Sequence, residues 1–271
     1  MYRNMIWRPF VAAFGKWTAN LLLALMGAAF VASAAWAEEN EATKILKAMS
    51  DYVTSQKSFS VKFDSDIEVI TPAVQKIQFT SSGEVLVDRP GRLRVTRKGG
   101  YADVELVFDG QTVSVLGRHD NVYAQASAAG TIDQLVELLR DQYAVDLPGA
   151  DLLLSNAFAV LSEDILDAKY IGHGVVDGIE SDHLAFRNHD TDWQIWIERG
   201  ERPVPRKYVI TSKAVAGAPQ YTLRITEWTS NAEIASNAFD FKPPAEARKV
   251  EVEALSGIDE VPAGVVEGET K

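Results

Sequence analysis

Four histidines are the side chains of this sequence whose type and spacing could support metal or acid–base chemistry. Three of them, His173, His183 and His189, lie close together in the chain, and the run His189–Asp192 is similar to a fragment of a metal site. Alternation places His173 near the start of a strand, His183 inside the next strand and His189 in a loop. These positions would converge only in a fortuitous hairpin register. We therefore predict surface or core histidines, His119 included, and no metal site.

The sequence also lacks the motifs of common catalytic centres. It has no cysteine, which excludes thiol catalysis, thiolate metal sites and a disulfide framework. It has no His-Glu-x-x-His zinc motif and no Gly-x-Ser-x-Gly nucleophile turn. We predict a non-enzymatic protein that needs no cofactor. An enzyme that uses His183, His189 and an acidic residue is the least favoured alternative.

The N-terminal residues have the pattern of an export signal. Arg3, Arg8 and Lys16 precede an apolar run over 21–31, and Ala35-Trp36-Ala37 offers small residues for cleavage after Ala37. Residues 1–37 are thus predicted to be a cleavable signal peptide for the periplasm, with an uncleaved anchor as the alternative. Without a cysteine there is no lipid anchor, so no permanent membrane anchor is expected. A net charge of −11 argues against nucleic acid as a partner.

The elements that would position a site are mostly strands. Apolar and polar residues alternate from Phe59 to Val69, which indicates a strand with one buried and one wet face. Similar stretches recur along the chain, and Asp109-Gly110 and Asp177-Gly178 are typical hairpin turns. Roughly ten strands follow from these patterns, and so wide a sheet curls or closes.

Helices are predicted in two groups. Apolar residues at helical spacing follow Asn40, a plausible N-cap, and Thr131 begins a capping box before a second apolar stripe. The apolar stretch 150–160 adds a buried helix. The predicted fold class is α+β and mainly antiparallel β, a strongly curved incomplete β-barrel with helices covering its concave face. Residues 38–255 would form a single domain, followed by a disordered acidic tail over 256–271.

Nine apolar residues of the first strands are predicted to line that concave face and to form the ligand-binding surface. They share the inward side of their strands, which can be either an ordinary filled core or a partly empty pocket for acyl chains. They are Phe59, Val61, Phe63, Phe79, Val85, Leu93, Val95, Leu106 and Phe108.

Four segments, in this order, resemble the superfamily of periplasmic lipoprotein carriers and outer-membrane lipoprotein receptors. They are Ser58–Phe63, Gly83–Val95 with its strand–Arg-Pro–strand motif, Val107–Val113 and Phe239–Pro244. The resemblance implies an incomplete antiparallel barrel lidded by helices. The segment 192–197, with 203–207, is similar to an uncharacterised branch of predicted periplasmic proteins.

The resemblance also suggests a role for one residue. In the carrier, the arginine of the Arg-Pro motif hydrogen-bonds the backbone of the lid helix and keeps the empty cavity shut. Arg89 occupies that position here. Its guanidinium has five donors that could satisfy carbonyl groups at a helix end. The alternative interpretation is that Arg89 simply begins a turn.

The leading hypothesis is a periplasmic binding module that holds a lipid or acylated ligand in a hydrophobic cavity. An envelope protein-interaction or stress-sensor domain that uses the same half-barrel to bind a protein partner is the alternative. Burial of a sixteen-carbon chain, at about 0.8 kcal/mol per methylene, supplies on the order of 10 kcal/mol without any catalytic group.

Overall fold

The computed structural model describes residues 40–145, 147–255, 258–262 and 265. The predicted signal peptide and its cleavage after Ala37 lie outside these residues, as does most of the predicted tail over 256–271. Residues Glu39–Lys271 form one compact unit. All elements below belong to it.

The described part of the chain contains twelve strands, somewhat more than the ten expected, in one sheet. The strands are β1 (Ser58–Ile70), β2 (Lys76–Asp88), β3 (Arg92–Gly99), β4 (Asp103–Phe108), β5 (Thr112–Gly117), β6 (Val122–Ser127), β7 (Asp167–Val176), β8 (Ile179–Arg187), β9 (Thr191–Glu198), β10 (Pro205–Ser212), β11 (Gln220–Ser230) and β12 (Arg248–Lys249).

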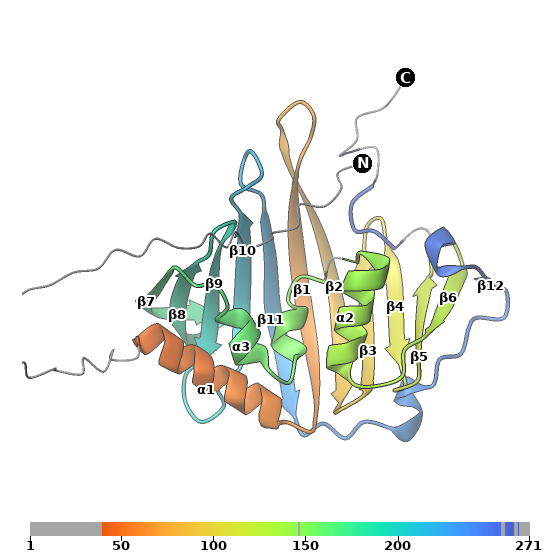
Figure 1. The fold of residues 1–271 in the computed structure, drawn as a ribbon, viewed down its shortest axis with the longest axis horizontal. Coiled ribbons are helices and arrows are strands. Elements are labelled where there is room, and N and C mark those ends of the chain that lie inside the picture. The colour runs from red at the N-terminus through yellow and green to blue at the C-terminus, as the bar shows by residue number, and fades with distance from the viewer. Residues whose placement is uncertain (1–39, 146, 256–257, 263–264, 266–271) are drawn as a thin grey trace, which may run out of the picture. The chain divides into compact units, whose positions relative to one another are not determined.

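The sheet is open and almost wholly antiparallel. Its strand order is β12-β6-β5-β4-β3-β2-β1-β11-β10-β9-β8-β7, so β11 joins the first strand of the chain to the second group of strands (Figure 1). Only the two-residue β12 pairs in parallel, with β6. The mainly antiparallel β prediction is therefore confirmed, and the two ends of the sheet are not joined into a closed barrel.

Three α-helices and three short 3₁₀ turns complete the described chain. The helices are α1 (Glu41–Ser55), α2 (Ile132–Tyr143) and α3 (Ala157–Leu161), and the 3₁₀ turns are η1 (Ala150–Leu153), η2 (Ser236–Phe239) and η3 (Val252–Ala254). Asn40 caps α1 by accepting a hydrogen bond from Ala42 N, and Thr131 and Gln134 form the predicted capping box of α2.

The helix predicted over 150–160 is divided into η1 and α3. The carboxylate of Asp133, in the first turn of α2, accepts hydrogen bonds from both the backbone N and the hydroxyl of Ser155, at 2.8 and 2.6 Å. A polar anchor of this kind competes with helical backbone bonds, and the chain breaks there.

Both long helices pack on the same face of the sheet. The buried side of α1 contacts Leu184, Ile195 and other residues of β8–β10, while the buried side of α2 contacts residues of β1–β5. Leu223 and Trp228 on β11 touch both clusters and join them into one core. We call the helix-covered side the inner face (Figure 1). Its predicted concavity stays a prediction. Among the described helices, none is long and apolar enough to cross a membrane.

Candidate functional site

Seven of the nine predicted lining residues lie in the apolar cluster beneath α2. The strand register arranges them in two rows across β1–β5, because side chains directly opposite one another share a face. The first row is Phe59, Val87, Leu93, Phe108 and Val113, and the second row is Val61, Val85, Val95, Leu106 and Val115.

The two rows differ in exposure. Every residue of the first row is buried beneath the apolar stripe of α2, formed by Ile132, Leu135, Val136 and Leu139. In the second row Val61 is buried, whereas its four partners are partly exposed. The apolar inner face therefore extends beyond the edge of the helix that covers it.

The two remaining predicted residues lie outside this cluster. Phe63, the next inward residue of β1, is buried against Gly83. Phe79 lies further along β2, is partly exposed, and makes an edge contact with Tyr101 at 5.4 Å between ring centroids. The sequence analysis missed Val87, Val113 and Ile225, although all three fit the alternation of their strands.

Arg89 lies between the sheet and the start of α2. Its guanidinium carbon is 5.7 Å from the ring centroid of Phe59, and the guanidinium interacts electrostatically with the carboxylate of Asp133. Burial lowers the pKa of Arg89, and the Asp133 charge offsets part of that effect. Within the described chain its Nε and Nη2 atoms are buried and make no hydrogen bond. The lid-closing role of Arg89 thus stays a prediction.

The turn that carries Arg89 also anchors α2. Pro90 O accepts a hydrogen bond from Ile132 N at 2.8 Å, and Gly110 O accepts one from Gly130 N at 3.0 Å. The β2–β3 and β4–β5 turns therefore hold the N-terminus of the helix, and Arg89 directly precedes the first of these contacts.

The histidines are not brought together into one site. His183 lies inside β8, stacked on Trp196 and bonded to Gln194 Oε1 at 2.9 Å, while His189 lies in the turn beyond β8. His183 is therefore about 13 Å along the strand from Arg187, the last residue of β8 before the turn that contains His189. His173 instead lies beside Asp182 and Tyr170, and His119 contacts Tyr101 O. No group of three metal-ligating side chains occurs among the residues that the structure describes.

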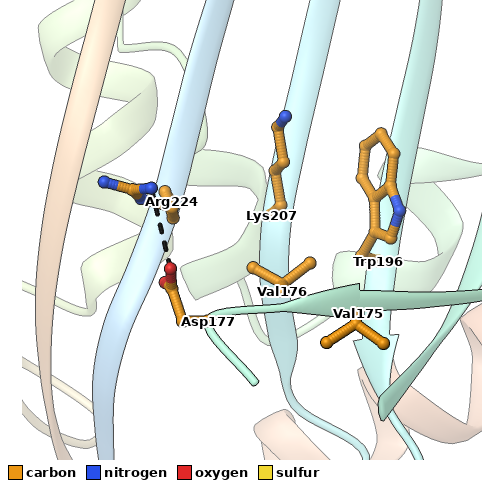
Figure 2. Close-up of a pocket in the computed structure, with 6 residues that line it drawn as sticks. All are labelled: Val175, Val176, Asp177, Trp196, Lys207 and Arg224. Atoms are coloured by element: carbon orange, nitrogen blue, oxygen red, sulfur yellow. Dashed lines mark ion pairs between the residues drawn. The ribbon is translucent and has the colours of Figure 1, made fainter. Parts of the chain in front are cut away.

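A hollow of about 370 Å³ opens on the opposite, outer face of the sheet. Trp196 belongs to this face because it alternates with the buried Ile195 and Ile197. Figure 2 shows the end of β7 passing in front of the neighbouring strands, with Asp177 directed at Arg224 at 3.6 Å. Lys207 Nζ lies 5.1 Å from the ring centroid of Trp196. The hollow is lined by Val175, Val176, Asp177, Trp196, Lys207 and Arg224.

Comparison with known proteins gives distant structural neighbours. No curated protein sequence matches the chain. An uncharacterized conserved protein from Thermus thermophilus is similar at 12% identity, over 78% of this chain and 98% of that one, with a TM-score of 0.46. LprF from Mycobacterium bovis is similar at 12% identity, over 72% and 96%, with a TM-score of 0.45. A LolA superfamily protein from Nitrosomonas europaea is similar at 12% identity, over 73% of this chain and 96% of that one, with a TM-score of 0.34.

The sequence itself matches one protein family. Residues 42–253 match the family described as "Predicted periplasmic protein (DUF2092)". Since this match spans most of the chain, the protein belongs to the DUF2092 family of predicted periplasmic proteins, the kind of branch that the segments 192–197 and 203–207 predicted.

Proposed function

We propose that this periplasmic protein holds a lipid or acylated ligand on the inner face of its sheet, under or in place of α2. The observation that carries the proposal is the pair of apolar rows across β1–β5, of which the second extends beyond the covering helix. A continuous apolar surface with a partly exposed edge is typical of a ligand site.

The energies of helix and ligand are of similar size. The four buried apolar residues of α2 contribute about 1.5–3 kcal/mol each, or roughly 6–12 kcal/mol together. A sixteen-carbon chain buried on the same surface contributes on the order of 10 kcal/mol. A ligand that takes the place of the helix therefore offsets most of the cost of opening.

Arg89 favours such an opening. A buried donor without a partner costs about 1–3 kcal/mol, and Arg89 has two such nitrogens near the N-terminus of α2. Movement of α2 would admit water or a polar ligand group to both. In this proposal Arg89 destabilises the closed state rather than locking it.

Brominated fatty acid provides a direct test. Trp228 stacks on Phe59 with ring centroids 4.9 Å apart and touches both core clusters. In a Trp193→Phe/Trp196→Phe variant of residues 38–271, Trp228 is the remaining tryptophan. We expect 9,10-dibromostearate to quench its fluorescence and stearate to leave it unquenched. Absence of both quenching and bound lipid, the latter measured by native mass spectrometry after delipidation and reloading, would contradict the proposal.

The hollow on the outer face favours a second candidate function, binding of an envelope protein. Val175 is 68% exposed beside Lys207 and Arg224, which together offer apolar and cationic contacts. Affinity capture from periplasm should then recover a partner with the wild-type protein and lose it with Lys207→Glu. Val95→Ser, a change on the partly exposed second row of the inner face, is the control and should leave capture of the partner unchanged.

A further inference from the structure

A polar niche lies on the inner face next to the apolar rows. Along β1 the inward residues run Phe59, Val61, Phe63 and Ser65, so that the pattern changes from apolar to polar. Ser65 and Ser81 are opposite one another on β1 and β2, and their hydroxyls are 2.9 Å apart in the buried interior. Arg97 on β3 completes the niche. The niche is offset along the strands from the second row by about 13 Å, the distance between Val61 and Ser65 on β1.

The carboxylate of Glu260 occupies this niche. Its Oε1 accepts a hydrogen bond from the Ser81 hydroxyl at 2.5 Å, and its Oε2 is 3.3 Å from Arg97 Nη1. Arg97 Nη2 also donates to Ile258 O at 2.6 Å. The Glu260 side chain is only 9% exposed and that of Arg97 29%. A carboxylate from a distant part of the chain is thus held by charge-assisted hydrogen bonds in a largely buried setting.

Tyr221 on β11 borders the same niche. Burial raises its pKa to about 12, and the negative charge of Glu260 contributes to the rise. A hydrogen bond with Ser65 opposes this shift. The neutral phenol, two hydroxyls and one guanidinium together supply several donors and a single full positive charge, which suits one anionic group.

The position of the niche relates it to the apolar rows. Phe63 and Gly83 separate it from the second row, whose residues Val85, Val95 and Leu106 are partly exposed. An acyl chain that lies along the strands, with its apolar part across the two rows, would therefore direct its polar end past Gly83 toward Arg97 and Ser81. The inner face thus combines apolar rows with an anion site beside them, further along the same strands.

We propose that Ser65, Ser81 and Arg97 form the head-group subsite for an anionic amphipathic ligand, a carboxylate or phosphate joined to an acyl chain, and that Glu260 occupies it as an internal competitor. The proposal rests on the ligand site described under Proposed function and specifies the polar end of its ligand. Glu260 presents the same carboxylate chemistry that a fatty acid would bring. Ligand binding then requires displacement of the 258–262 segment.

Competition predicts opposite effects for two substitutions in residues 38–271. Glu260→Gln weakens the internal competitor and should raise the affinity for 11-(dansylamino)undecanoic acid about three- to tenfold. Arg97→Met removes the cation and should lower that affinity at least tenfold. Neither should change binding of the methyl ester of the same probe by more than twofold. Lys98→Met is the matched control, since Lys98 is the exposed neighbour of Arg97 on the opposite face of β3.

Displacement of the bound probe by hexadecanoate, hexadecyl phosphate or hexadecanol determines which head group the subsite prefers. Displacement of the probe by either anion in preference to the alcohol supports the subsite and says which anion it takes. Thermal unfolding of each variant checks that it is folded. If the probe acid and its methyl ester bind with equal affinity to the wild type and to both variants, the proposed head-group subsite is wrong, while the proposed ligand site on the apolar rows is still supported. If no variant binds either probe, both proposals fail.

Discussion

The ring of Phe63 fills the space that Gly83 leaves on the neighbouring strand. The two residues are opposite one another in the β1–β2 register, and a methyl group at Gly83 would come within 2.5 Å of Phe63 Cζ and 2.1 Å of Thr96 O. This contact lies between the apolar second row and the polar niche. On β2, Gly83 therefore marks the boundary between the apolar second row and the polar niche.

We predict that Gly83→Ala destabilises the fold by about 1–3 kcal/mol, because the added methyl group overpacks a site bounded by an aromatic ring and backbone. The free energy of unfolding from urea denaturation measures the effect. Gly100→Ala is the matched control, because no atom lies within 4 Å of its added methyl group. It should change the unfolding free energy by less than about 0.5 kcal/mol. Equal effects of the two substitutions would contradict the role of Phe63.

Alternation and capping were sufficient to predict most elements. The strands from Phe59 onward, the Asp109-Gly110 hairpin and the N-caps Asn40 and Thr131 occur as expected, because each depends on residues close in sequence. The prediction of one helix over 150–160 was wrong because Asp133, some twenty residues away, bonds Ser155. The two-residue β12 has too few residues to show any periodicity.

The site was predictable only in its apolar part. Strand periodicity identifies inward residues, which is why seven of the nine fall in one cluster. The same pattern contained a signal that the sequence analysis did not use, since Ser65 and Ser81 are polar at inward positions. The bonds of Ser81 and Arg97 with Glu260 join residues more than 150 apart in the sequence, which no local pattern encodes.

Arg89 and Arg206 provide a contrast between unpaired and paired buried guanidinium groups. We predict that Arg89→Met changes the unfolding free energy by less than about 1 kcal/mol, because relief of two unsatisfied donors offsets the lost contact with Phe59. Arg206→Met should cost about 3 kcal/mol, because it leaves the Glu198 carboxylate without its buried partner. Urea denaturation of both variants compares them. A large loss for Arg89→Met would favour the lid-closing role instead.

The turn between β8 and β9 should give a measurable dependence of stability on pH. Hydrogen bonds from Arg187, assisted by Lys213, lower the pKa of Asp192 to about 2. A depressed carboxyl pKa stabilises the fold above the unfolded value near 4, and that contribution is lost as pH falls toward 2. Because the pair is largely exposed, we expect Asp192→Asn to cost at most about 1 kcal/mol at pH 7.

The difference between wild type and Asp192→Asn should shrink steadily between pH 4 and pH 2 in urea denaturation. Asp141→Asn serves as the control, because Asp141 is exposed and forms no ion pair within the described chain. A difference that is constant across this pH range would show that the substitution acts through packing of the turn rather than through charge.

The capping box of α2 allows the opening of that helix to be tested separately from general stability. Thr131→Ala removes the hydroxyl that accepts from Gln134 N and should cost about 0.5–2 kcal/mol. Asn40→Ala removes the comparable cap of α1, which covers the other core cluster. If α2 moves to admit an acyl chain, Thr131→Ala should speed stopped-flow uptake of a dansyl fatty acid severalfold. Asn40→Ala should leave the rate within twofold despite a similar loss of stability, and equal rates in the two variants would mean that α2 is a fixed part of the core.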